Sequence, residues 1–162
     1  SLGIALLMVL ALLTSVFRSV RMGLLGLLPL GLTILAVFAL LSTFGIYLDS
    51  VTALIASIVL GIGIDYSVHF VSRYRRALEG GAAEGDAVRI ALTASGPAIV
   101  FNSLAVAAGF LVLVLSSFWP VIHIGWIVAT TMVVAALLTL TLLPAILSRG
   151  PGPAQASGEG GA

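Results

Sequence analysis

The sequence has no cysteine and no lysine, and only 8% of its 162 residues are charged. Without cysteine there are no disulfides and no thiolate metal sites. Soluble domains carry about 25% charged residues, so the low charge content places this chain outside that class. The net charge is only +1, and its basic residues follow a membrane pattern described below, so we expect no nucleic-acid partner.

Long apolar runs dominate the sequence instead. Hydrophobic residues make up 60% of the chain, and the mean hydropathy is +1.26. A helix that crosses a bilayer needs about 20 mostly apolar residues. None of the runs alternates apolar and polar residues as barrel strands do. The sequence therefore predicts an all-α membrane protein, a bundle of five transmembrane helices at about 2–17, 23–45, 51–72, 97–116 and 121–143.

The basic residues predict the orientation of the bundle. All of them are arginine, and they fall between the first and second spans, between the third and fourth, and after the fifth. The other two connections contain none. Arginine-bearing connections stay on the cytoplasmic side of a plasma membrane, so we predict an outside N-terminus and a cytoplasmic C-terminus. The arginines, interpreted here as topology anchors, are Arg18, Arg21, Arg73, Arg75, Arg76, Arg89 and Arg149.

The segments between and after the spans have distinct compositions. Within the third connection we predict a glycine turn and then a short amphipathic segment at about 84–95, with Pro97 in the first turn of the next span. Residues 148–162 are rich in glycine, proline, alanine and serine, which predicts a disordered cytoplasmic tail. The chain begins with Ser1 in apolar sequence, without the features of a signal peptide. We expect residues 1–147 to be the membrane bundle of a longer protein.

One acidic residue, Asp65, lies inside the third span. It is about seven residues, or ~10 Å, from the predicted inner end of that helix. An aspartate at that depth costs about 2.5–3.5 kcal/mol, whereas a hydrogen bond between membrane helices contributes about 0.6 kcal/mol on average. Helix pairing alone therefore does not offset the cost. Because hydrocarbon disfavours the charged form, a carboxyl there is suited to gain and lose a proton.

The neighbours of Asp65 suggest how such a proton would move. Tyr66 places a hydroxyl at nearly the same depth, and His69 follows one turn later on the helical face of Asp65. On the fourth span, Asn102 lies at a similar depth, so we expect it to approach Asp65. Small residues that allow close helix packing occur on both spans: Ser57, Gly61, Gly63, Ala105 and Gly109.

Three kinds of soluble-protein site are excluded. The stretch "GIGIDY" lacks the GxGxxG spacing of a dinucleotide-binding loop and lies within an apolar run. His69 and His123 belong to opposite faces of the membrane, so they do not form a metal site. No nucleophile and base occur at one depth. We therefore expect no catalytic residue, no metal and no enzyme activity.

Three stretches resemble one transporter family. "GIGIDYSVHFVSRYRRAL" (61–78), "AVRIALTASGPAIVFNSLAVAAGFLVLVLSSFWP" (87–120) and "IGWIVATTMVVAALLTLTLLPAIL" (124–147) are similar to helices of RND-superfamily exporters. The closest similarity is to the MMPL branch, whose bundle is shared with the sterol-sensing domain. The resemblance extends over residues 1–147. It implies that the chain is the C-terminal five-helix membrane half of a 12-helix transporter.

The resemblance also implies roles for residues and partners. Asp65 and Tyr66 would carry a proton relay, with protons as the coupling ion and no cofactor. Where many family members have threonine or serine in the next helix, this chain has Asn102 and Ser103, so the partner of Asp65 stays open. The expected partners are the other transporter half and an extracytoplasmic porter domain, in the same chain or a homo-oligomer. The expected substrates are lipids or other hydrophobic or amphiphilic molecules.

Two other functions remain open from the sequence. One is a regulatory or lipid-binding bundle like the sterol-sensing domain, without proton coupling. The other is a structural membrane anchor in which Asp65 only pairs helices. In either of these, Asp65 would be dispensable for proton movement.

Overall fold

The structure is a computed structural model that describes residues 2–17, 19–43 and 50–148, without the side chains of 2, 5, 16, 50–57, 59 and 60. Described residues form helices and short turns, with no strand among them, so the all-α prediction is confirmed. The elements are α1 (Leu2–Phe17), α2 (Val20–Thr43), α3 (Ser50–Glu79), α4 (Glu84–Leu111), the 3-10 helix η1 (Val112–Leu115) and α5 (Trp119–Leu147).

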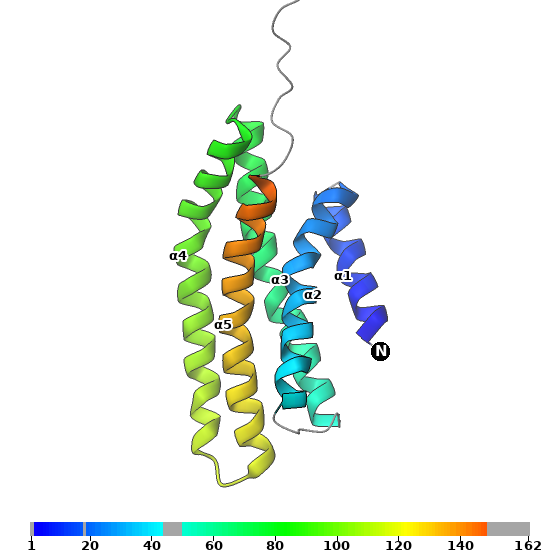
Figure 1. Ribbon diagram of the computed structural model, residues 1–162, viewed down its shortest axis with the longest axis vertical. Helices are drawn as coiled ribbons and strands as arrows, with labels where there is room; N and C mark the ends of the chain where they lie inside the picture. Colours follow the sequence, from blue (N-terminus) through cyan, green and yellow to red (C-terminus); the bar gives the residue numbers. More distant parts are fainter. Residues whose placement is uncertain (1, 18, 44–49, 149–162) are drawn as a thin grey trace, which may run out of the picture.

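The helices run alternately up and down in one bundle (Figure 1). Helices α4 and α5 form a long antiparallel pair, and α3 packs against both of them and against α2. Helix α1 is outermost and contacts only α2 and α3 among these elements. One end of the bundle gathers the C-termini of α1, α3 and α5 and the N-termini of α2 and α4. The described arginines belong to these helix ends: Arg21, Arg73, Arg75, Arg76 and Arg89.

Three of the described helices are long and apolar enough to cross a membrane, by length and composition. They are α2, the continuous unit of α4 and η1, and α5. Helix α3 has 30 residues, a length of about 45 Å against a hydrocarbon core of about 30 Å. Helix α1 has 16 residues and contains a shorter apolar stretch, Leu6–Ser15. The five predicted spans thus correspond in order to α1 through α5; the sidedness of the bundle stays a prediction.

The connection between α3 and α4 is the glycine turn that the sequence predicts. Gly81 has a φ of 87°, a left-handed conformation that glycine adopts without a Cβ clash. The amide of Gly81 donates to the Leu78 carbonyl at 2.9 Å, and the amide of Ala82 donates to the Ala77 carbonyl at 3.1 Å. This Schellman pattern satisfies the last carbonyls of α3. It sends the chain back antiparallel into α4.

The predicted break between the segment 84–95 and a span starting at Pro97 is absent. Helix α4 is continuous from Glu84 and includes Pro97 in its interior. Proline inside a membrane helix is tolerated where neighbouring helices hold the backbone, and Ala87, Ala91 and Ser95 form a buried face just before it. Packing of these residues thus extends the helix ahead of Pro97, where the sequence predicts its start. The predicted tail lies outside the described residues beyond Ser148.

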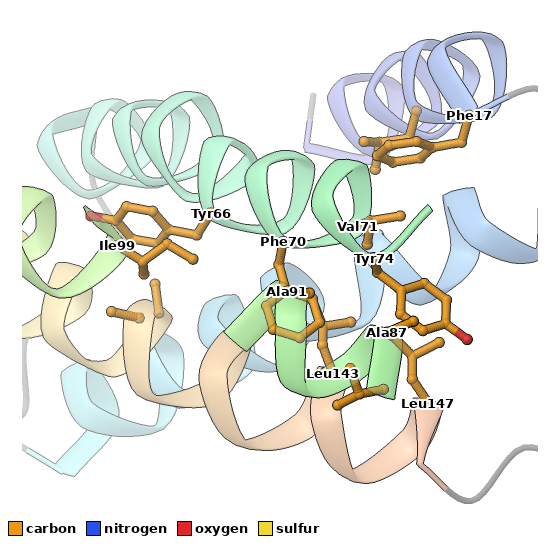
Figure 2. Packing of buried hydrophobic residues seen from close by; sticks show 14 residues of the cluster. Phe17, Tyr66, Phe70, Val71, Tyr74, Ala87, Ala91, Ile99, Leu143 and Leu147 are labelled. Carbon is orange, nitrogen blue, oxygen red and sulfur yellow. The ribbon is translucent and has the colours of Figure 1, made fainter. Parts of the chain in front are cut away.

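The largest core cluster joins α3 to α1, α4 and α5. Phe70 is fully buried and points from α3 toward Ala91 of α4 and Leu143 of α5 (Figure 2). Two glycines allow especially close approaches elsewhere. A Cβ added at Gly23 of α2 would lie 2.7 Å from Thr14 Oγ1 of α1, and one at Gly125 of α5 would lie 2.7 Å from the Phe110 carbonyl of α4. These contacts close the α1–α2 and α4–α5 hairpins.

Candidate functional site

Asp65 and Tyr66 are neighbours in α3 that face in different directions. Consecutive residues of a helix are about 100° apart, so they cannot share one face. The Asp65 side chain is exposed on the surface of the bundle, whereas Tyr66 is only 1% exposed. Figure 2 shows the Tyr66 ring beside Ile99 of α4. One member of the predicted pair is therefore at the surface, and the other is in the core.

The buried Tyr66 hydroxyl lies where three helices meet. It donates to Met132 Sδ of α5 at 4.0 Å, and a thioether is a weak acceptor. Asn102 of α4 and Asp65 are near enough to act on this hydroxyl electrostatically. The Tyr66 hydroxyl thus lies in the interior, between Met132 and the two exposed polar residues of α3 and α4.

The expected approach of Asn102 to Asp65 stays a prediction. Asn102 is exposed, as Asp65 is, and both interact with Tyr66. His69 is also exposed, one turn further along α3. Ser103 is buried, and its hydroxyl donates to the Val100 carbonyl of its own helix at 2.9 Å. The roles of His69, Asn102 and Ser103 as relay partners stay predictions, and the Ser103 hydroxyl already has an acceptor.

The predicted packing residues divide between the inside and the outside of the bundle. Gly63 is buried, and a Cβ there would lie 2.9 Å from Leu30 Cδ1 of α2. Gly61 and Gly109 are exposed, and a Cβ at either would meet nothing within 4 Å. Ala105 is exposed as well, and the Ser57 side chain lies outside the described part of the chain. Only Gly63 of this set therefore packs closely against another described helix.

The exposed residues of α3 and α4 include an ionisable side chain, polar and small residues, and one aromatic ring. We call the following residues the open face: Gly61, Asp65, His69, Phe101, Asn102, Ala105 and Gly109. The Phe101 side chain on it is 79% exposed. Among the three helices that are long and apolar enough to cross a membrane, the unit of α4 and η1 is the least covered: 17% of its apolar window is buried, against 39% for α2 and 50% for α5. The ionisable Asp65 side chain lies on a surface that the described residues do not cover.

Ser67 is a residue whose situation sequence reasoning missed. It is completely buried, and its hydroxyl has no hydrogen-bond partner among the described residues. A buried hydroxyl left without a partner costs about 1–3 kcal/mol. Its Cβ, with Leu13 and Phe17 of α1, surrounds Gly26 of α2. The unsatisfied hydroxyl therefore lies at the junction of α1, α2 and α3.

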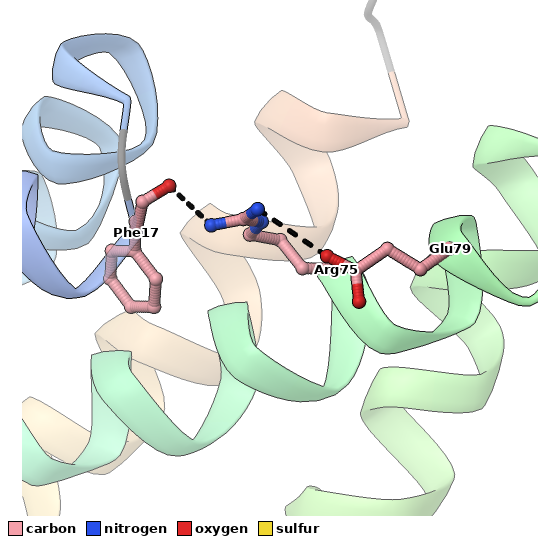
Figure 3. A network of polar contacts seen from close by, with 3 residues as sticks. All are labelled: Phe17, Arg75 and Glu79. Atoms are coloured by element: carbon pink, nitrogen blue, oxygen red, sulfur yellow. Dashed lines mark hydrogen bonds and ion pairs between the residues drawn. The ribbon is translucent and has the colours of Figure 1, made fainter.

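Arg75 has a role beyond that of a topology anchor. Its guanidinium donates through Nη1 to the backbone carbonyl of Phe17, the last residue of α1, and through Nη2 to Glu79 Oε1 at 3.4 Å (Figure 3). The last carbonyls of a helix have no partner within that helix, and a cation is favourable there. The charge pattern revealed the arginine, but only the fold brings α1 to it.

The described residues contain no group of three or more His, Asp or Glu side chains suited to a metal ion. The Tyr66 hydroxyl contacts Met132, with Asp65 and Asn102 exposed on the neighbouring surfaces of α3 and α4. Such an arrangement can hold or pass a proton at the edge of a helix bundle. It contains no arrangement for covalent catalysis.

Comparison with known proteins identifies the family of this chain. A sequence model of the MMPL family matches residues 1–152, and this chain belongs to the MMPL family. Putative membrane protein MJ1562 of Methanocaldococcus jannaschii is 30% identical over 89% of this chain and 37% of its own length. Putative membrane protein ActII-3 of Streptomyces coelicolor is 33% identical over 89% of this chain and 21% of its own.

A further relative has a named activity. The sulfolipid-1 exporter MmpL8 of Mycobacterium tuberculosis is 33% identical over 57% of this chain and 8% of its own length. The chain spans 37% or less of the length of each of these three relatives. It therefore corresponds to one part of larger membrane proteins.

Proposed function

We propose that this chain is the membrane half of a proton-driven exporter of the RND/MMPL type, with Asp65 and Tyr66 as its proton relay. The observation that carries the proposal is the position of Asp65: an exposed carboxyl on the open face, next in the chain to Tyr66, whose buried hydroxyl donates to Met132 Sδ. Membership in a family that contains a named sulfolipid-1 exporter supports the class of activity. The proton relay is our inference from the chemistry of the site.

The open face implies a partner. An aspartate facing lipid costs about 2.5–3.5 kcal/mol, so the exposed Asp65 carboxyl needs a cover that the described residues do not supply. We propose that the other transporter half covers it, in the same full-length chain or in a second copy. The small residues Gly61, Ala105 and Gly109 would let helices of that half approach closely. An extracytoplasmic porter domain is the other expected partner.

The relay itself works through hydrogen bonding at a changing charge. We propose that the ionised Asp65 carboxylate draws nearby donors such as the Tyr66 hydroxyl and the Asn102 amide toward it, away from the Met132 contact that the hydroxyl makes in this structure. In the protonated state, that demand falls, and the hydroxyl is free to favour Asn102 or Met132. Each proton gained or lost therefore shifts the packing between α3 and α4. That shift is the movement proposed to drive export, with protons as the only coupling ion and no cofactor.

The available energy suffices for export. One charge crossing a potential of about 100 mV releases ~2.3 kcal/mol, which supports a concentration ratio of about 50-fold. We propose lipids or other hydrophobic and amphiphilic molecules as substrates, because a relative carries the name of a sulfolipid exporter. The bundle would lie in the plasma membrane with the arginine-bearing helix ends in the cytoplasm.

A reconstitution experiment tests the relay. The full-length protein is placed in liposomes that contain the pH indicator pyranine, an acid-outside gradient and membrane potential are imposed, and N-phenyl-1-naphthylamine serves as the hydrophobic probe. We expect Asp65→Asn to lower proton entry and probe movement at least about 100-fold, since the amide does not titrate at these pH values. The matched control is Asp86→Asn, which removes an exposed carboxyl in the first turn of α4. Unchanged proton entry in Asp65→Asn would remove the proposal.

A further inference from the structure

The contact between α1 and α3 is made at few places. Among the described residues, helix α1 contacts α2 and α3 but neither α4 nor α5. A movement of α3 therefore reaches α1 either directly or through α2. On the side of α3, the junction consists of buried side chains of α1, Leu13 and Phe17, and of the guanidinium of Arg75 on the Phe17 carbonyl. Among the described residues, the polar part of the junction therefore depends on the guanidinium of Arg75.

The two partners of that cation differ in strength. The pair with Glu79 is a one-turn contact within α3 at 3.4 Å, and the Glu79 side chain is 67% exposed; such pairs contribute little. The bond to Phe17 joins two helices, is partly buried and places a full positive charge at the negative end of the α1 dipole. Charge-assisted bonds are about twice as strong as neutral ones. The bond to α1 is therefore the dominant interaction of Arg75.

Asp65 and Arg75 belong to the same uninterrupted helix. They are ten residues apart, or about 15 Å along the axis, and a continuous helix moves over that length as one body. The buried Ser67 hydroxyl, which lacks an acceptor among the described residues, lies on α3 between them and faces the same junction. A buried donor without an acceptor is unfavourable. If the junction had a second conformation in which the Ser67 hydroxyl found an acceptor, this hydroxyl would be unpaired in the first conformation, as it is here.

We propose that Arg75 is a positioning residue that fastens the C-terminal end of α1 to α3 and carries the movement of α3 into α1 when Asp65 changes its protonation state. This inference rests on the proposed proton relay and deepens it. It assigns to one arginine a coupling role that the distribution of charges alone does not suggest.

Distance measurements in the full-length protein test this coupling without any substrate. Nitroxide labels are attached at Ser15→Cys of α1 and at Ser148→Cys at the C-terminal end of α5, both exposed positions, after any cysteines elsewhere are replaced; α5 serves as the reference because it does not contact α1 among the described residues. We expect one narrow distance distribution in the parent and a shifted one when Asp65→Asn fixes the neutral state. In Arg75→Gln we expect a broad distribution that Asp65→Asn does not change. The matched control, Arg76→Gln, removes an exposed arginine of the same helix turn and should respond like the parent.

Conservative replacement separates coupling from folding. In Arg75→Lys an ammonium still donates to one carbonyl, so we expect the distribution to stay narrow and the response to Asp65→Asn to persist. If Arg75→Gln does not accumulate in the membrane, Arg75→Lys alone provides the test. A broad distance distribution in Arg75→Lys, or one that Asp65→Asn does not change, would contradict the inference. A parental distribution and response in Arg75→Gln would overturn the inference, and so would a parent that ignores Asp65→Asn. Failure of the relay is seen separately, as normal proton entry into liposomes by Asp65→Asn.

Discussion

The two faces of α3 have opposite surroundings. One face buries Tyr66, Ser67, Phe70 and Val71 to 1% exposure or less, between α1, α2, α4 and α5. The other face shows Asp65 and His69 on the surface, although it lies in the same stretch of helix. The buried face is packed as closely as a protein core. The open face has an ionisable group, and an added Cβ at Gly61 or Gly109 there would meet nothing within 4 Å. The difference indicates that the buried face holds the bundle together, and it places the proposed function on the open face.

The largest expected effect on folding comes from the buried face. Phe70→Ala removes a fully buried ring, and we expect the free energy of unfolding to fall by about 3 kcal/mol, the lower end for such changes, because lipid replaces part of the transfer term. The matched change on the open face is Phe101→Ala, where the ring is 79% exposed. In the isolated bundle, this change should alter the free energy of unfolding by less than about 0.5 kcal/mol. Equal losses would break the comparison of the two faces.

Two glycines sharpen the same contrast with a single methyl group. At Gly125 the added Cβ meets the Phe110 carbonyl at 2.7 Å and Leu113 Cβ at 3.0 Å, so Gly125→Ala should destabilise the bundle by about 1–3 kcal/mol. At Gly109 the Cβ meets nothing within 4 Å, so Gly109→Ala should gain up to about 1 kcal/mol of helix propensity. Thermal unfolding in one detergent measures both. A stable Gly125→Ala protein would show that the α4–α5 approach is looser than described.

Tyr66→Phe separates stability from relay chemistry at the boundary of the two faces. The ring stays buried, and the hydroxyl loses a weak bond to Met132 and its contact with Asn102. We expect the unfolding free energy to change by about 1 kcal/mol, while proton entry in the liposome assay falls about tenfold. Proton entry equal to the parent would assign Tyr66 to packing alone.

The smallest expected effect concerns the exposed partner of Arg75. Glu79→Gln removes a surface ion pair of 3.4 Å and should change the unfolding free energy by less than about 0.5 kcal/mol. Arg75→Gln also removes the bond to the Phe17 carbonyl, and we expect it to lower the unfolding free energy by about 1.5–3 kcal/mol, as for other hydrogen bonds to charged groups. Thermal unfolding of the two variants in parallel measures the difference. Similar losses in both would mean that the ion pair, rather than the contact with α1, makes Arg75 important.

The sequence predicts the elements of this fold well because membrane helices are governed by simple rules. Apolar runs of sufficient length form the five helices, and a glycine supplies the turn before α4. The exception is the start of α4: Pro97 predicts a span that begins there, whereas the helix begins at Glu84 and its buried residues Ala87 and Ala91 precede the proline. Helix length in a bundle depends on neighbours that a single-chain pattern does not reveal.

Sequence reasoning identified candidate-site residues only where a residue type is unusual within a membrane helix. An acid in an apolar run singles out Asp65, and its neighbour Tyr66 follows from the motif. The contacts with Met132 and between Arg75 and the end of α1 involve residues that are ordinary in a membrane helix or at its end. They arise from three-dimensional packing between segments at least 58 residues apart, which local periodicity does not encode.

Infrared difference spectroscopy of the full-length protein tests the central claim most directly. Spectra are compared before and after an acid step, and the Asp65→Asn variant identifies the carboxyl bands that belong to this residue. The account predicts that a protonated-carboxyl band appears at the acid pH, disappears on return to neutral pH, and is missing in the variant. A spectrum in which the parent and the variant show the same carboxyl bands throughout the working pH range would contradict the claim that Asp65 gains and loses a proton.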